Sequence, residues 1–174
     1  IGKEINMLGM LAKFFKVLNG DAAPGQIALG FAFALFIGLT PFLSVHNIVI
    51  LFLVFAIRVN LSAFFLASAL FSVLAYGLDP LSVLLGESLL ASPSLQEFWT
   101  GLYQSDFWRA TKFNHTLLLG SLSISLLLFI PVLMISRKLI SLYRERFMAW
   151  FEKLKISKMI KASKFYKLYE KLGA

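Results

Sequence analysis

The sequence predicts an all-α membrane protein with a helical hairpin, two transmembrane helices, an interfacial N-terminal helix and a basic amphipathic C-terminal helix. The chain of 174 residues is 59% hydrophobic, with a mean hydropathy of +0.79, whereas an average soluble domain is about 45–50% apolar. Residues 27–57 contain no Lys, Arg, Asp or Glu. Such a run is typical of chain embedded in lipid, because one charge at the bilayer centre costs about 2.5–3.5 kcal/mol on insertion scales.

The net charge of +8 is concentrated in the C-terminal tail. Residues 137–174 hold 11 of the 17 basic residues and 3 of the 9 acidic residues, so the rest of the chain is neutral overall. A basic tail after a hydrophobic helix is typical of a segment that binds anionic lipid, so we expect a phospholipid membrane as a partner and no nucleic acid. The chain has no Cys, and its 2 His residues lack metal-ligand spacing, so we expect no metal and no other cofactor.

Residues 1–23 predict an N-terminal helix in the membrane interface. Between positions 7 and 18, Leu and Phe side chains recur on one helical face and two Lys side chains fall on the opposite face. This pattern suits a helix that lies along the membrane surface. A turn signal at residues 19–21 separates this helix from the membrane domain, which we expect at residues 24–136.

The first membrane element is a predicted hairpin that breaks at Thr40–Pro41. Proline has no N–H and disfavours helix at the residue before it, so we expect the arms at residues 24–39 and 41–57, with the second helix beginning at Pro41 or at Ser44. Each arm is about 24 Å long at 1.5 Å per residue, slightly less than the hydrocarbon core of about 30 Å. The hairpin is therefore either two short, tilted crossings or a re-entrant pair whose tip stops at or below the far interface.

Three further segments complete the membrane domain. Residues 61–78 predict a transmembrane helix, and we expect Asp79 to cap a new helix after it. Residues 80–112 are less hydrophobic and predict short helices in an outer-side loop, with aromatic side chains at the membrane boundary. Residues 115–136 lack any charge over 22 positions and predict the clearest transmembrane helix.

The tail, residues 137–174, predicts a basic amphipathic helix. Apolar side chains fall at spacings of three and four, and Lys and Arg side chains occupy the other face, which suits a membrane surface or a partner protein. The membrane-surface contacts are expected from Arg137, Lys138, Arg144, Arg146, Lys153 and Lys155. Because both chain ends are basic, the positive-inside rule places both in the cytoplasm. A hairpin that turns back at its break gives the even number of crossings that this orientation requires.

Small and polar residues of the hairpin are the candidate site. Gly30, Ala34 and Gly38 recur every four residues, a spacing that lets another helix approach closely in lipid. They either pack against the partner arm or line a groove for an acyl or isoprenoid chain. The candidate headgroup contacts are Thr40, Pro41, Ser44, His46, Asn47, Arg58 and Asn60. Arg58 is also compatible with an anchor at the interface.

The sequence indicates no enzyme. The apolar segments contain no carboxylate that could form an acid–base pair with a His. There is no Ser-His-Asp arrangement that the spacing supports, no phosphate-binding P-loop and no dinucleotide-binding glycine pattern. We therefore expect no catalytic residues.

The hairpin sequence also resembles a known family. The run PGQIALGFAFALFIGLTP at residues 24–41, followed by Arg58-Val-Asn60, resembles the bacterial membrane family of domain of unknown function 2062. This chain departs from the family pattern at Asn47, where a Gln is expected, and at Asp79-Pro80, where Asn-Pro is expected. The segments LTPFLS and ASKFYKLY are similar to a proteobacterial subfamily. The resemblance implies a location in the bacterial inner membrane and no settled activity.

Two functions are compatible with these observations. The first is a non-enzymatic inner-membrane protein that handles or transports lipid, either by itself or as the membrane subunit of a lipid-transfer complex, because transporters place substrate sites at broken helices. The fusion of related proteins to glycosyltransferase domains points to lipid-linked sugars or polyprenyl phosphate. The second is a structural scaffold or anchor subunit of a larger membrane complex. The chain is small for a monomeric transporter, so we expect a homo-oligomer or a larger membrane or periplasmic partner.

Overall fold

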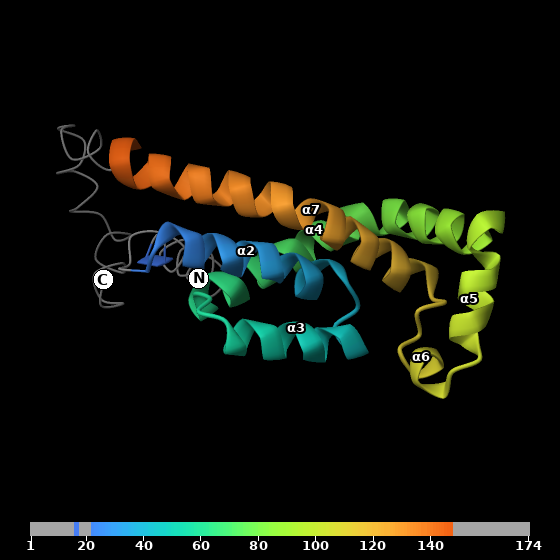
Figure 1. Ribbon diagram of the computed structural model, residues 1–174. Helices are drawn as coiled ribbons and strands as arrows, with labels where there is room; N and C mark the ends of the chain where they lie inside the picture. The colour runs from blue at the N-terminus through green and yellow to red at the C-terminus, as the bar shows by residue number, and fades with distance from the viewer. Residues whose placement is uncertain (1–15, 18–21, 148–174) are drawn as a thin grey trace, which may run out of the picture.

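The computed structural model describes residues 16–17 and 22–147, and these form a helical bundle (Figure 1). The elements are α2 (Pro24–Leu39), α3 (Val45–Ala56), α4 (Leu61–Ala91), the 3₁₀ turn η1 (Pro93–Leu95), α5 (Gln96–Tyr103), α6 (Asp106–Ala110), α7 (Thr116–Leu142) and the π-helical turn η2 (Tyr143–Phe147). Within these residues no strand occurs, which confirms the predicted all-α class. The predicted interfacial helix and most of the tail lie outside the described residues.

α2, α4 and α7 form the centre of the bundle. α4 and α7 are long antiparallel helices, and α2 packs against both of them (Figure 1). α3 runs back along one side of α2 and makes its contacts mainly with that helix. α5 and α6 cover one end of the bundle, whereas α2 begins and α7 ends at the other end. At that end, the Arg144 side chain, which follows α7, donates a 2.9 Å hydrogen bond to the carbonyl of Ala22, which precedes α2.

Among the residues that the structure describes, two helical stretches are long and apolar enough to cross a membrane. They comprise Leu61–Ala91 and Thr116–Arg146, of 31 residues each. At 1.5 Å per residue each is about 46 Å long, which exceeds the hydrocarbon core of about 30 Å. α2 and α3 are shorter apolar helices of 16 and 12 residues.

The second hairpin arm is shorter than predicted. α2 ends at Leu39, as the proline predicts, and α3 begins at Val45, directly after Ser44, which is the later of the two expected starts. Residues 40–44 form a loop because Ser44 has extended backbone geometry, with φ −114° and ψ 143°. Three residues after Pro41 are therefore outside helix, and two of them, Phe42 and Leu43, are exposed.

α4 differs most from the prediction. The helix expected to end at residue 78 runs through Asp79 and Pro80 to Ala91, so Asp79 lies inside it and caps no helix. Pro80 removes the hydrogen bond that its N–H would have donated to the Tyr76 carbonyl. Contact with α7 beyond the proline holds the helix together. The first part of the predicted outer-side loop is thus an extension of α4.

α7 also continues past its predicted end. Arg137 and Lys138 lie within α7, which ends at Leu142. The helix continues because Ile140 is buried against Ile27 and Ala63. Of the other predicted membrane-surface residues, Arg144 and Arg146 lie in η2, whereas Lys153 and Lys155 lie outside the described residues.

The long helices touch backbone to backbone at glycines. A Cβ atom at Gly86 of α4 would overlap the Thr116 carbonyl of α7, and a Cβ atom at Gly120 of α7 would overlap the Ser82 carbonyl of α4. Any side chain at either glycine would force the helices apart. Small residues therefore set the distance between α4 and α7, as they do in many membrane bundles.

The small residues of α2 face α4 rather than the partner arm. A Cβ atom at Gly30 would lie 3.0 Å from the Asn60 carbonyl oxygen and from the Phe64 amide nitrogen, and one at Gly38 would overlap Phe71. Ala34 is fully buried in a cluster with side chains of α4. The sequence had indicated packing on the other hairpin arm or a groove, and the structure places this row against α4.

The glycine contact gives a prediction of stability. We expect Gly86→Ala to lower the free energy of unfolding by about 1–3 kcal/mol, because the added methyl group overpacks the contact with α7. Gly77→Ala is the matched control in the same helix, since nothing lies within 4 Å of its added Cβ atom. Thermal unfolding in detergent measures both, and equal melting temperatures for the two variants would contradict the proposed contact.

Candidate functional site

Asn47 holds the loop between α2 and α3. Its side-chain nitrogen donates hydrogen bonds to the carbonyl oxygens of Pro41, at 3.1 Å, and Phe42, at 3.0 Å. The Ser44 hydroxyl donates to the Pro41 carbonyl at 2.6 Å. Both side chains are buried. The amide hydrogens of Asn47 are therefore used inside the loop and are not available to a ligand.

Thr40 joins the end of α2 to the start of α3. Its hydroxyl donates to the Phe36 carbonyl at 2.5 Å and lies 2.9 Å from His46 Nε2. Since the one hydroxyl proton is directed at Phe36, we assign His46 Nε2 as the donor to the Thr40 oxygen. The Asn47 Oδ1 atom lies 3.3 Å from the same hydroxyl. The polar residues that follow the break thus form one closed network.

The predicted headgroup contacts do not form a single site. Thr40, His46 and Asn47 lie at one end of α3, whereas Arg58 and Asn60 follow its other end, about 18 Å away along a helix of 12 residues. Arg58 is exposed. The two sets are separated because the arm between them is a straight helix.

Asn60 has a structural role. Its side chain accepts a 2.8 Å hydrogen bond from the Ala63 amide and so caps the N-terminus of α4. Its own amide donates to the Gln26 carbonyl of α2 at 3.2 Å. Asn60 thereby connects the starts of two central helices, close to Gly30.

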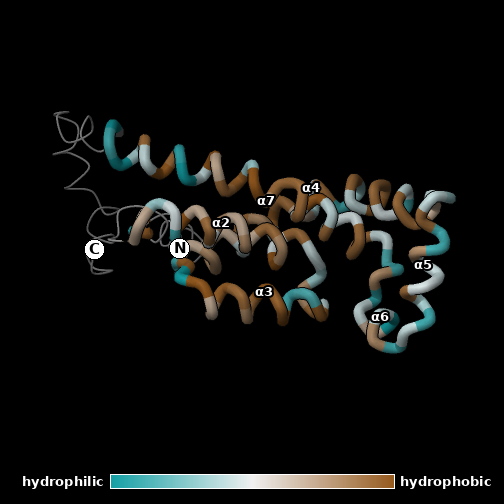
Figure 2. Tube along the Cα trace, viewed as in Figure 1, coloured by the Kyte–Doolittle hydropathy of each residue, from teal (hydrophilic) through white to brown (hydrophobic). Residues whose placement is uncertain are grey.

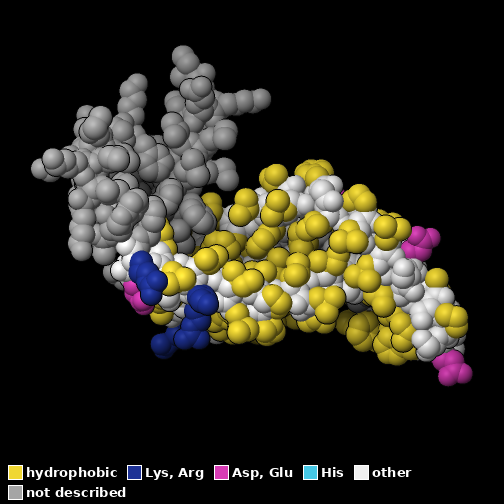
Figure 3. Space-filling view, turned by 90° about the horizontal axis from the view of Figure 1, so that it is seen from above, with side chains coloured by type: hydrophobic (Ala, Val, Ile, Leu, Met, Phe, Trp, Pro, Cys, Tyr) yellow, Lys and Arg dark blue, Asp and Glu magenta, His cyan; other side chains and the backbone are white. Residues whose placement is uncertain are grey.

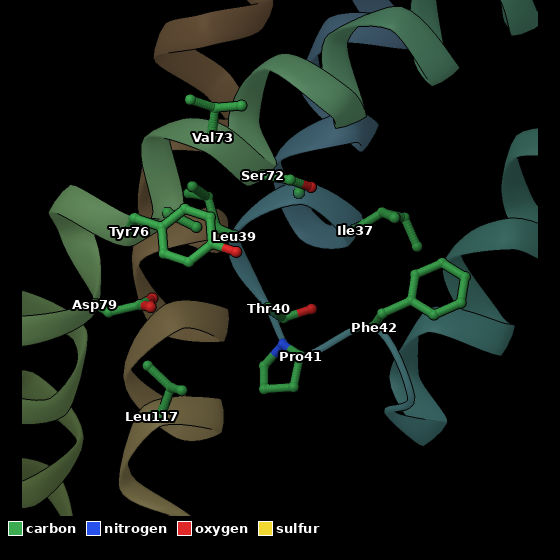
Figure 4. A pocket seen from close by; sticks show the side chains of 12 residues that line it. Ile37, Leu39, Thr40, Pro41, Phe42, Ser72, Val73, Tyr76, Asp79 and Leu117 are labelled. Carbon is green, nitrogen blue, oxygen red and sulfur yellow. The ribbon is translucent and has the colours of Figure 1, made fainter.

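A cavity of about 560 Å³ opens beside the loop (Figure 4). It lies between the end of α2, the middle of α4 and the start of α7. Its walls are formed by Ile37, Gly38, Leu39, Thr40, Pro41, Phe42, Ser72, Val73, Ala75, Tyr76, Asp79 and Leu117. Most of these side chains are apolar. Of the candidate contacts, Thr40 and Pro41 line this cavity.

Asp79 is the charged residue of this cavity. Its carboxylate is half-buried, and no other charged side chain is among the residues that line the space. In the part of the chain that the structure describes, it forms no hydrogen bond or ion pair. The sequence pattern does not single out Asp79, because a capping role accounts for an acid before a proline, although an acid beside a long apolar stretch is itself a signal of function.

A smaller cavity of about 200 Å³ lies on the same loop. Pro41 lines both cavities, and Lys112 and His115 line the smaller one. Lys112 has a φ of 56°, which is uncommon for a residue with a side chain. Groups of opposite charge therefore adjoin the same loop.

The arrangement suits binding of an amphiphile. Among the described residues, no group of three or more His, Cys, Asp or Glu side chains could hold a metal ion. The larger cavity offers apolar walls for a chain and a single carboxylate for a polar group. Its volume lies in the range of about 300–1,000 Å³ that is usual for ligand pockets.

The outer surface around the loop is apolar. The exposed fractions of Phe42 and Leu43 are 72% and 95%. On α3, the large exposed apolar side chains are Val45, Ile48, Val49, Phe52 and Phe55. Figure 2 shows that α3 is hydrophobic over most of its length and hydrophilic near its first turn. This surface is suited to lipid or to another apolar surface.

Comparison with known proteins identifies similar sequences without a described activity. The family described as "Uncharacterized protein conserved in bacteria (DUF2062)" matches residues 10–149. A protein of Treponema pallidum (strain Nichols), described as "Uncharacterized protein", is 28% identical over 138 residues, which are 79% of this chain and 85% of that protein. No solved structure matches the chain. The family match includes the loop and both cavities.

The loop network gives a second prediction. We expect Asn47→Leu to lower the free energy of unfolding by about 1–3 kcal/mol, because the Phe42 carbonyl then loses its side-chain donor. Asn114→Leu is the matched control, since Asn114 is exposed. The readout is the melting temperature in detergent. If the two substitutions lower it equally, the Asn47 side chain does not hold the loop.

Proposed function

The chain belongs to the bacterial family of domain of unknown function 2062, and from this premise we propose that it is a multi-pass protein of the bacterial inner membrane that handles lipid without enzymatic activity. The family itself was predicted from the hairpin motif. The likeness to a proteobacterial subfamily stays a prediction. The fold supports the proposed membrane arrangement, and the cavity supports the proposed handling of lipid.

The distribution of charge supports an orientation with both ends in the cytoplasm. Figure 3 shows Lys and Arg side chains gathered at one end of the visible face with an acidic side chain beside them, other acidic side chains towards the far end and an apolar surface between the two ends. The basic end holds the start of α2 and the end of α7. The positive-inside rule places such an end in the cytoplasm. α5 and α6 then lie on the outer side.

The loop supports the re-entrant form of the hairpin. α2 has 16 residues and is about 24 Å long, less than the hydrocarbon core of about 30 Å. The exposed residues at the tip, Phe42 and Leu43, favour lipid over water. Irregular backbone inside a membrane needs internal hydrogen bonds, and Asn47 and Ser44 supply them. The hairpin thus enters from the cytoplasmic side and turns back within the bilayer.

The cavity beside the loop is the observation on which the lipid-handling proposal rests. It lies against the end of the re-entrant arm and is lined mainly by apolar side chains. Asp79 lies about 27 Å along α4 from Leu61, which is near the outer limit of the hydrocarbon core. A lipid in this cavity would hold its headgroup at the outer interface and its chain against α2 and α4.

The scaffold function remains the second candidate, and α3 favours it. The helix packs mainly on α2 and exposes a row of large apolar side chains. The same row suits a second copy of the chain or a larger membrane or periplasmic partner. A scaffold would show no stoichiometric lipid in its cavity, so the two functions differ in a measurable way.

Single cysteines test the membrane arrangement, because the natural chain has none. We expect a membrane-impermeant maleimide to label Gln104→Cys in intact spheroplasts and Arg58→Cys after permeabilisation. Leu43→Cys should stay unlabelled in both cases, because the tip lies in lipid. Labelling of Leu43→Cys in intact spheroplasts would show instead that the hairpin crosses the membrane completely.

Native mass spectrometry tests lipid binding at the cavity. We expect the wild-type protein, released gently from its own membrane, to retain one lipid, and Val73→Trp to lose it because the larger side chain fills the cavity. Val83→Trp is the control, since Val83 lies on the same helix and outside the cavity lining. A lipid-free wild-type protein in a larger assembly would favour the scaffold function.

A further inference from the structure

The charge in the cavity restricts the headgroup that can bind there. A carboxylate accepts hydrogen bonds and repels other anions. Asp79 is the charged residue among those that line the cavity, and Figure 4 shows it beside the space enclosed by Leu39, Pro41 and Leu117. The basic residues Arg58 and Arg137 belong to the opposite half of the bundle, and Lys112 lines the adjoining cavity rather than this one. The cavity is therefore negative, and a headgroup whose only charge is a phosphate is disfavoured.

The surroundings of Asp79 favour a cation with an apolar chain. Tyr76, one turn earlier on α4, lines the same cavity, and its ring offers a face for a cation. Ile37, Leu39 and Val73 supply apolar wall. An ionised acid near a membrane core is costly unless a partner compensates it, and within the described residues Asp79 has no such partner.

We propose that the cavity binds the ammonium group of a zwitterionic phospholipid, with Asp79 as the group that selects it. This inference rests on the proposed lipid-handling function and names its ligand class. The ammonium group lies against the Asp79 carboxylate, and an acyl chain follows the apolar wall formed by α2 and α4. Lys112, in the adjoining cavity across Pro41, supplies a cation for the phosphate of the same headgroup. The polyprenyl phosphate expected from the sequence lacks the ammonium group.

Competition between headgroups tests the proposal on the wild-type protein. The purified protein is incubated in detergent with phosphatidylethanolamine and phosphatidylglycerol of identical acyl chains, and native mass spectrometry measures the ratio of the two complexes. We expect about tenfold more phosphatidylethanolamine complex, which corresponds to about 1.4 kcal/mol. Phosphatidylcholine should compete with phosphatidylethanolamine, whereas phosphatidic acid should not. An equal ratio, or a preference for phosphatidylglycerol, would overturn the proposal.

Matched variants assign the preference to Asp79. We expect Asp79→Asn to bind a lipid with a ratio close to one, because the amide keeps the size of the side chain and removes its charge. Glu87→Gln removes an exposed carboxylate from the same helix and should keep the wild-type ratio. A preference that persists in Asp79→Asn overturns the role of Asp79. If that variant does not fold, the headgroup series on the wild-type protein still decides the ligand class.

The possible outcomes distinguish a failure of the ammonium site from a failure of the proposed lipid-handling function. A wild-type protein that retains no lipid contradicts lipid handling itself. A protein that retains lipid without regard to headgroup contradicts only the ammonium site. Soluble ethanolamine in excess distinguishes the source of the ammonium group. A wild-type protein that binds ethanolamine and retains no phospholipid would overturn the assignment to a phospholipid, whereas a retained phospholipid supports it.

Discussion

Close packing of α2 between α4 and α7 is the interaction on which the rest of the structure depends. Gly30 and Gly38 bring the α2 backbone against α4. On the other side, the Ser125 hydroxyl of α7 lies 3.2 Å from the Leu35 carbonyl of α2. In lipid there is little hydrophobic drive between helices, so close contact and hydrogen bonds between them carry more of the association. A fixed α2 in turn fixes the loop at its end and one wall of the cavity.

The polar residues after the helix break are explained by their surroundings. A loop in contact with lipid must satisfy its own backbone groups. Asn47 and Ser44 meet this need at Pro41 and Phe42, and Thr40 ties the loop back to α2. Residues that resemble a ligand-binding cluster in the sequence therefore stabilise the turn. The charged side chain of the larger cavity is Asp79, on a different helix, and it has no partner among the described residues.

Local sequence rules predicted the local features of this chain. The end of α2 at Leu39 follows from Pro41, and the helical class follows from the charge-free runs. The continuation of α4 through Pro80 could not be predicted in this way, because it depends on contact with α7 at Gly86. Such contacts join residues far apart in the chain.

The site was predicted only in part, for a similar reason. Thr40 and Pro41 do line the larger cavity. Arg58 is separated from them by the length of α3. The sequence pattern alone does not specify this separation, because it does not specify how the two arms of the hairpin fold. Asp79 enters the cavity because α4 does not break. Its role follows from the position of a helix, and no motif in the sequence specifies that position.

The short hairpin has a mechanical consequence for the surrounding membrane. α3 is about 18 Å long, far shorter than the neighbouring α4 and than an unperturbed hydrocarbon layer. In the proposed re-entrant arrangement the apolar tip at Phe42 and Leu43 stays in lipid, so α3 would not have to thin the bilayer as a short complete crossing would. The outer leaflet would instead lie over the tip. A lipid approaching the cavity from that flank would then meet it from above the hairpin rather than from beside a full crossing.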